Sequence, residues 1–165
     1  MKNKILKYRN FLWLAMMAFA LFPLAAEAQN KKDKKEQIKR IIEAQNYVFK
    51  AQTALPTSGA TRQLTSDYDL RISKDTILSD LPYFGRAFTA PLNPSEGPLR
   101  FTSTDFQYSV ANRKKGGWNV TITPKDVQDP KQINMSIFDN GTASVVVTSY
   151  NRQPISFNGY ITAKK

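Results

Sequence analysis

The chain has 165 residues, of which 41% are hydrophobic, with a formal net charge of +11 and neither cysteine nor histidine. The absence of cysteine excludes disulfide bonds, thiolate nucleophiles and sulfur-ligated metals, and the absence of histidine excludes Ser-His-Asp triads and histidine-ligated zinc. We therefore expect one domain held together by its core, without a metal or cofactor, in which binding is favoured over catalysis.

The first 28 residues have the three parts of a secretory signal peptide. Residues 1–10 carry basic side chains and no acid, residues 11–25 are almost wholly apolar, and Ala26-Glu27-Ala28 places small residues where a signal peptidase cleaves. The apolar run is short for a membrane-spanning helix, which needs about 20 residues. We expect cleavage after Ala28, no transmembrane segment afterwards, and a periplasmic or secreted protein.

A charged segment and an amphipathic helix follow the signal peptide. Residues 29–36 are expected to be a flexible lead-in, and residues 37–165 to form a single domain. The helix has one apolar stripe, which predicts packing on the outside or across an open end of a sheet. Its apolar positions are Ile38, Ile41, Ile42, Val48 and Phe49. The excess of lysine favours an anionic envelope surface as a partner, whereas export argues against nucleic acid.

From Leu64 onward, apolar residues recur at every second position, which predicts about eight short antiparallel strands joined mostly by tight turns. One hairpin is predicted to pair Phe106 with Ile122, Tyr108 with Val120 and Val110 with Trp118. Around Gly141 the pattern favours a bulged type I turn that pairs Phe138 with Thr142 and aligns residues 133–137 with 143–147. The predicted fold is mainly β, either an up-and-down antiparallel barrel or a strongly curved sandwich, preceded by one helix.

The segment 81–91 combines two prolines, three aromatic residues, Gly85 and Arg86. We interpret it as a kinked strand near the middle of the sheet, because proline removes a backbone donor and glycine permits a bulge. Arg86 could present its guanidinium group to a carboxylate or phosphate between aromatic walls. The alternative, which we favour, is that Phe84 and Phe88 belong to the core while Arg86 points outward or pairs with an acid.

Four short motifs occur in a fixed order along the chain. They are Leu81-Pro82-Tyr83-Phe84-Gly85-Arg86-Ala87, Lys115-Gly116-Gly117-Trp118, Asn140-Gly141-Thr142-Ala143 and Asn151-Arg152-Gln153-Pro154-Ile155. Together they resemble the exported bacterial family known as domain of unknown function 4251, over residues 47–161. The resemblance implies a location in the cell envelope, and the family has no assigned activity or catalytic residues that could be transferred.

The leading functional hypothesis is a non-enzymatic binding module for a small anionic or amphipathic ligand, held in an aromatic-lined region of the sheet. The candidate ligand-binding residues are Tyr83, Phe84, Gly85, Arg86, Trp118 and Arg152. The alternative is an interaction or scaffold protein, with a filled interior, that docks on an envelope partner through its sheet or its basic N-terminal helix. A hydrolase would need two carboxylates facing a cleft, and the close pairs Asp67/Asp69 and Asp126/Asp129 are expected to be surface charge.

Overall fold

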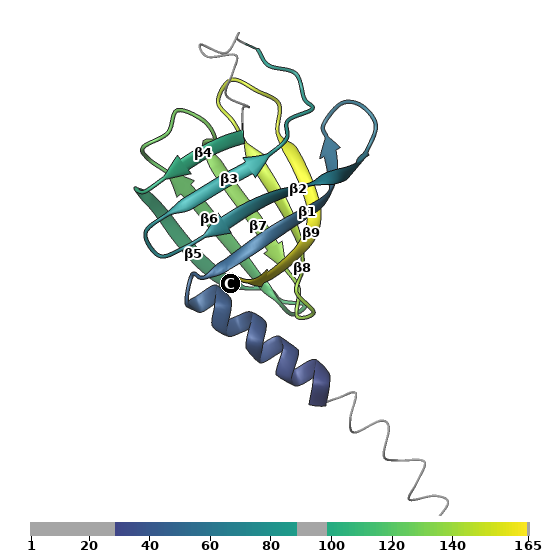
Figure 1. The fold of residues 1–165 in the computed structure, drawn as a ribbon, viewed down its shortest axis with the longest axis vertical. Helices are drawn as coiled ribbons and strands as arrows, with labels where there is room; N and C mark the ends of the chain where they lie inside the picture. The colour runs from purple at the N-terminus through teal and green to yellow at the C-terminus, as the bar shows by residue number, and fades with distance from the viewer. Residues whose placement is uncertain (1–28, 89–98, 165) are drawn as a thin grey trace, which may run out of the picture.

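The computed structural model describes residues 29–88 and 99–164, so the predicted signal peptide lies outside the described residues. A helix, described over residues 29–43, precedes nine strands, and the predicted mainly β fold is confirmed (Figure 1). The strands are β1 Tyr47–Pro56, β2 Arg62–Ile72, β3 Ile77–Leu81, β4 Leu99–Ser103, β5 Phe106–Asn112, β6 Trp118–Pro124, β7 Gln132–Ile137, β8 Thr142–Thr148 and β9 Ile155–Ala163. Within these ranges no helix has the length and apolar character required to cross a membrane.

The nine strands form one antiparallel sheet in the order β4-β3-β2-β1-β9-β8-β7-β6-β5. Neighbours in the chain are neighbours in the sheet, with two exceptions: β1 also pairs with β9, and β4 does not pair with β5. Figure 1 shows β1 to β4 crossing in front of β5 to β8, so that the sheet curls onto itself. The result is a nearly closed up-and-down barrel whose two edges are β4 and β5, as the alternation of apolar residues predicts.

The interior of the barrel holds the hydrophobic core. Large side chains from both halves of the sheet meet there without exposed surface. They include Tyr47, Phe49, Leu70, Ile122, Ile133, Met135 and Phe157. Burying a side chain of this size contributes roughly 1.5–3 kcal/mol to stability, so this cluster is the main source of folding free energy.

The helix closes one end of the barrel with only its last turns. Ile38 and Ile42 are buried in the core, whereas residues 29–37 are exposed and project away from the sheet (Figure 1). The expected helix boundaries are wrong at both ends, because residues 29–36 are helical and the helix stops at residue 43. Gln45 has a φ of 50° and ends the helix, and Tyr47, Phe49 and Ala51 then alternate as inward-facing residues of β1. Because Val48 between them is also apolar, the sequence does not alternate between apolar and polar residues at the start of β1.

The two predicted hairpins have different outcomes. The bulged turn is confirmed, since Gly141 has a φ of 84° and the Phe138 N–H donates to the Thr142 carbonyl. The register predicted for β5 and β6 is wrong by two residues, because Tyr108 faces Ile122 and Phe106 faces Pro124. A shift of two keeps every side chain on the same face of the sheet, so the apolar pattern could not distinguish the two registers.

Asp126 holds the corner at which the chain passes from β4 to β5. Its carboxylate accepts hydrogen bonds from the Ser103 hydroxyl and from the backbone N–H groups of Thr104 and Asp105. The Ser103 hydrogen bond, followed by that from Thr104, lowers the pKa of Asp126 well below its ordinary value. The carboxylate therefore stays ionised and fixes the turn where the strand ladder is interrupted.

Two tyrosines join the helix end to the barrel wall. The hydroxyl oxygens of Tyr47 and Tyr108 are 3.2 Å apart, and the Tyr108 hydroxyl donates to the Ile42 carbonyl at 3.1 Å. Burial raises the pKa of Tyr108 to about 12 and raises that of Tyr47 well above 10. The folded protein thus holds both protons more tightly than the unfolded chain does.

We expect this tyrosine pair to make the protein sensitive to alkali. Because both folded-state pKa values are raised, the stabilisation is complete below pH 10 and is lost as the pH rises towards and beyond 12. Each tyrosine contributes a slope of about 1.4 kcal/mol per pH unit over that window. Urea unfolding across this range checks the slope, which Tyr108→Phe should reduce. The same slope in Tyr108→Phe as in the exposed control Tyr150→Phe would contradict the assignment.

Candidate functional site

The end of the barrel opposite the helix carries the segment that the sequence singles out. The prediction of a kinked strand over this segment is wrong, because β3 ends at Leu81 and residues 82–86 belong to no strand. The chain instead crosses the loop between β8 and β9. The Phe88 N–H donates to Asn151 O at 2.8 Å, and the Gln153 N–H donates to Arg86 O at 3.1 Å. Pro82 has no N–H to continue the ladder, which explains why β3 stops before it.

Tyr83 ties these two loops together. The single hydrogen of its hydroxyl is shared between the carbonyl oxygens of Arg86 and Gln153, which lie 2.9 and 3.0 Å from the hydroxyl oxygen. A methyl group at Gly85 would lie 2.4 Å from that hydroxyl oxygen, so the loop needs glycine for the close approach. Burial and the nearby Asp129 raise the pKa of Tyr83, although Arg152 opposes them, and the hydroxyl remains a donor at neutral pH. Tyr83 and Gly85 therefore have a positioning role in this loop.

Arg152 is the most buried cation at this end. Its Nε lies 3.3 Å from Asp129 Oδ2, and the two side chains are only 14% and 18% exposed. The contact is an ion pair without hydrogen-bond geometry, because neither Asp129 oxygen has a hydrogen-bond partner among the described residues. The buried side-chain oxygen of Gln153 also has none there. The carboxylate that faces the Arg152 guanidinium thus lacks hydrogen-bond donors in the described residues.

Cations pack on aromatic rings around this ion pair. The charge centre of Arg62 is 4.8 Å from the Phe84 ring, that of Lys131 is 5.4 Å from the Tyr150 ring, and that of Arg152 is 5.7 Å from the Tyr83 ring. Phe88 and Tyr150 are 69% and 65% exposed, and Arg86 is also exposed. We call this surface the loop-end rim. Its members are Arg62, Tyr83, Phe84, Arg86, Phe88, Lys131, Tyr150 and Arg152.

The structure brings together five of the six candidate residues and separates the sixth. Tyr83, Phe84, Gly85, Arg86 and Arg152 lie at the loop end. Trp118 starts β6, is 6% exposed, and pairs with β7 beside the turn that contacts the helix. It is a core residue at the opposite end of the barrel. The expectation that Phe88 is a core residue is also wrong, whereas Arg86 points outward as favoured.

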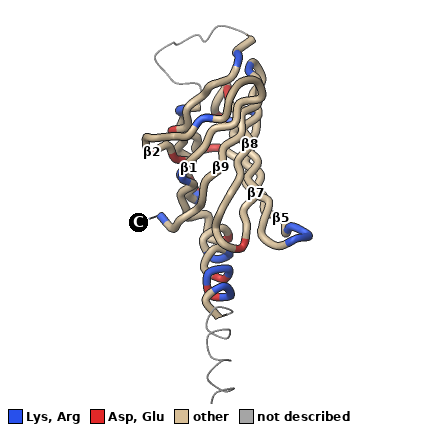
Figure 2. Tube along the Cα trace, turned by 90° about the vertical axis from the view of Figure 1, so that its right-hand side faces the viewer, with Lys and Arg blue, Asp and Glu red and all other residues tan. Residues whose placement is uncertain are grey.

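Four residues of this region are missing from the candidate ligand-binding residues, and one of them, Asp129, was expected to be surface charge but is ion-paired with Arg152. They are Arg62, Asp129, Lys131 and Tyr150. Each lies in or beside a loop that connects strands at the same end of the barrel. Counting alternate connections from residues 82–88 would have found only Arg62, because β4 and β5 do not pair and the alternation of ends is interrupted between them. Figure 2 shows other basic residues along the helix and at the turn after β5.

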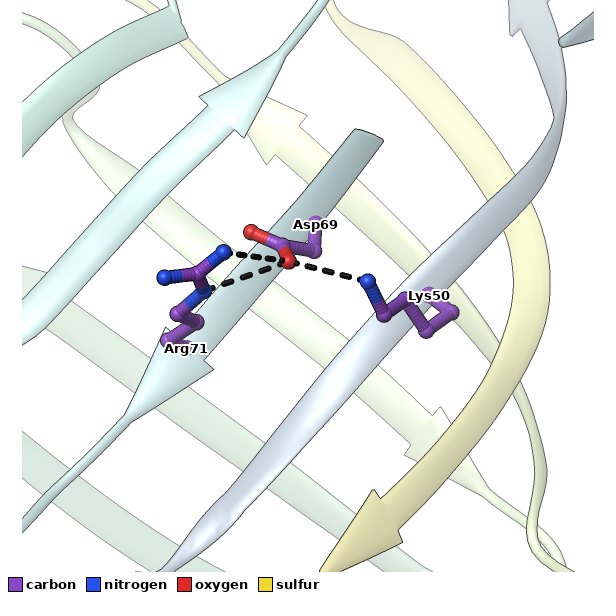
Figure 3. Close-up of polar contacts among 3 residues, drawn as sticks. All are labelled: Lys50, Asp69 and Arg71. Atoms are coloured by element: carbon purple, nitrogen blue, oxygen red, sulfur yellow. Dashed lines mark hydrogen bonds and ion pairs between the residues drawn. The ribbon is translucent and has the colours of Figure 1, made fainter. Parts of the chain in front are cut away.

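A second charged cluster lies on the outer face of the sheet (Figure 3). One oxygen of Asp69 contacts Lys50 Nζ and the Arg71 guanidinium at 3.1 Å, and the residue is 2% exposed. Asp69 is therefore buried and ion-paired, which corrects the expectation that it is surface charge. Its second oxygen has no hydrogen-bond partner in the described part of the chain. The two cations offset the negative charge of Asp69, whose pairing partner on β3, Asp80, is also acidic.

Removing both cations of this cluster should lower the free energy of unfolding by more than the sum of the two single changes. Lys50→Met and Arg71→Met each leave Asp69 with one cationic partner. The double variant leaves the buried carboxylate without any, which should cost about 2 kcal/mol beyond the two single losses. Adding Asp69→Asn to the double variant should restore most of this loss. Urea unfolding of the unmodified chain, the two single variants, the double variant and the triple variant measures the coupling, and strict additivity would show that Lys50 and Arg71 act on Asp69 independently.

The comparisons with known proteins concern family and fold. The family described as "Domain of unknown function (DUF4251)" matches residues 29–161. A crystal structure of a DUF4251 family protein from Bacteroides eggerthii is similar, with a TM-score of 0.55 and 17% identity, covering 79% of this chain and 87% of that one. No curated protein matches the sequence. Because the family match spans most of the chain, this protein belongs to the DUF4251 family of unknown function.

Proposed function

We propose that this protein is an exported, non-enzymatic binding module that takes a small amphipathic anion at the loop-end rim. The observation that carries the proposal is the gathering of three cation–aromatic pairs at one end of the barrel. Three of the four cation–aromatic pairs found in the described residues lie at this end, and the fourth, Arg113 with Phe138, lies at the other. Exposed Phe88 and Tyr150 offer apolar contacts beside the cations.

The ligand would lie on the rim rather than inside the barrel. The core cluster occupies the interior, and its largest side chains have no exposed surface. The exposed guanidinium of Arg86 and the cation of Arg62 would meet the anionic group, and the aromatic side chains would meet the apolar part.

Titration calorimetry with dodecyl phosphate as the probe tests the proposal. Arg86→Ala and Arg62→Gln should each weaken binding about tenfold or more without changing the unfolding midpoint, because both side chains are exposed. Lys74→Ala, at the exposed turn between β2 and β3, is the matched control and should bind normally. Equal binding of dodecyltrimethylammonium, which is a cation, would show that the site does not require a negative charge on its ligand. If Lys74→Ala weakened binding as much, the rim would not be the site.

The basic helix favours a second function, docking on an envelope partner. Residues 29–37 project from the barrel with every side chain exposed, and four of these nine residues are lysines. We expect the mature chain to begin at Gln29, which the intact mass of the exported protein checks. Replacing Lys31, Lys32 and Lys34 by Gln should abolish capture of anionic vesicles in low salt while leaving probe binding at the rim intact. Loss of rim binding instead would connect the helix to the ligand site.

A further inference from the structure

The edge strand β5 lacks the features by which proteins protect exposed sheet edges. It has seven residues, none of them charged and none proline. Natural edge strands are usually short, or carry lysine, proline or a bulge that prevents another strand from pairing. The other edge, β4, follows that rule, because it has five residues and carries Arg100, which pairs with Asp80. The contrast marks β5 as an edge built to accept a strand.

The free hydrogen-bonding groups of β5 can be identified from its ends. The Lys125 N–H donates to Asp105 O, and the Arg113 N–H donates to Gly117 O, so odd-numbered residues of β5 direct their backbone groups to β6. Backbone groups alternate along a strand, and even-numbered residues therefore direct theirs to the outer edge. Across residues 29–88 and 99–164, no strand pairs with that edge. The free groups belong to Phe106, Tyr108, Val110 and Asn112.

The charges at the two ends of β5 select the partner and its direction. Asp105 precedes the strand, and Arg113, Lys114 and Lys115 follow it. Figure 2 shows this basic turn projecting from the body of the sheet. An antiparallel copy of the same strand places each acidic end against a basic end, whereas a parallel copy opposes like charges. The strand is thus complementary to itself.

We propose that two copies of this chain associate through β5, in a two-fold antiparallel pairing centred on Ser109. In this register the even-numbered residues exchange hydrogen bonds, Tyr108 with Val110 of the second copy, and Asp105 faces Arg113 of the second copy. The outward side chains at the centre are Gln107, Ser109 and Ala111, which are small or neutral and exposed. The pairing joins two nine-stranded sheets across a two-fold axis and leaves the loop-end rim free in both copies.

Because the chain contains no cysteine, a single introduced thiol tests both the surface and the register. Two Ser109 residues would face each other as a non-hydrogen-bonded pair with Cα atoms about 4.5 Å apart, a distance that a disulfide spans. Ser109→Cys should therefore form a disulfide-linked dimer when diamide takes up the two thiol hydrogens. Gln107→Cys, on the same face of the same strand, places its two thiols about 14 Å apart and should stay monomeric on a denaturing gel.

Sedimentation velocity of the exported protein across a concentration series gives the independent measurement. The unmodified chain should form a dimer, and Ser109→Lys, which sets like charges opposite each other at the two-fold axis, should raise its dissociation constant about tenfold or more while Ser109→Ala does not. Circular dichroism and the urea midpoint check that each variant is folded. A monomer at every concentration would overturn the proposal. So would a dimer that survives Ser109→Lys or that crosslinks equally through Gln107→Cys.

Discussion

Gly159→Ala is expected to unfold the protein, because a methyl group at this position would lie 1.9 Å from the Lys50 carbonyl oxygen of β1. Gly159 is buried in β9 and pairs with Ala51 and Ala143 on its two sides. The obstacle is backbone in a strand that is bonded on both edges, so it cannot move as a flexible side chain can. We expect a loss of about 3 kcal/mol or more, a large part of the stability of a domain of this size.

Urea unfolding followed by circular dichroism measures this effect. Asn158→Ala, the exposed neighbour in the same strand, is the control and should change the free energy of unfolding by less than about 0.5 kcal/mol. The close approach lies next to an irregularity of β1, where its register with β9 shifts between Ala51 and Thr53. If Gly159→Ala were as stable as Asn158→Ala, the approach of β1 to β9 would have to be wider than described.

Ile42→Asp should separate the helix from the barrel and cost about 4 kcal/mol or more, because it places an unpaired carboxylate where Ile42 has no exposed surface. Ile42 sits in the last turn of the helix and, with Ile38, covers the end of the core cluster. Opening this end would also remove the acceptor of the Tyr108 hydroxyl. We therefore expect loss of the cooperative unfolding transition and binding of a hydrophobic dye.

Two further variants separate packing from charge at this helix. Ile42→Val keeps an apolar side chain and should cost only about 0.5–1.5 kcal/mol. Lys34→Asp makes a larger change in charge on the exposed part of the same helix and should leave the midpoint nearly unchanged. Unfolding by Lys34→Asp, or tolerance of Ile42→Asp, would contradict the assignment of the last helical turns as the closure of the barrel.

The sequence predicts the sheet well where turn chemistry and apolar pattern agree. Gly141 admits a left-handed conformation, and the residues on both sides of its turn alternate in phase, so register and turn type follow together. At the β5 to β6 hairpin two glycines, Gly116 and Gly117, allow more than one turn length, and registers two residues apart bury the same face. Local pattern specifies the face, and only the closed turn specifies the register.

The candidate site is predicted less completely because it is made of long-range contacts. The two prolines and Gly85 mark residues 82–88 as special, but nothing local places Asp129 beside Arg152 or Arg62 beside Phe84. Those pairs follow from which loops share an end of the barrel. Trp118 was grouped with Tyr83 because both are aromatic residues in motifs, although they belong to opposite ends. A topology is needed before residue types can be assembled into a site.

The position of β9 determines when this protein can finish folding. β9 lies between β1 and β8 and is the strand that joins the β1–β4 half of the sheet to the β5–β8 half. It is also the last strand in the chain, so β1 must wait for a partner more than 100 residues away in sequence. Closing so long a loop slows folding and leaves open strand edges in the unfinished chain. During synthesis from the N-terminus the barrel can therefore close only after its final strand has emerged.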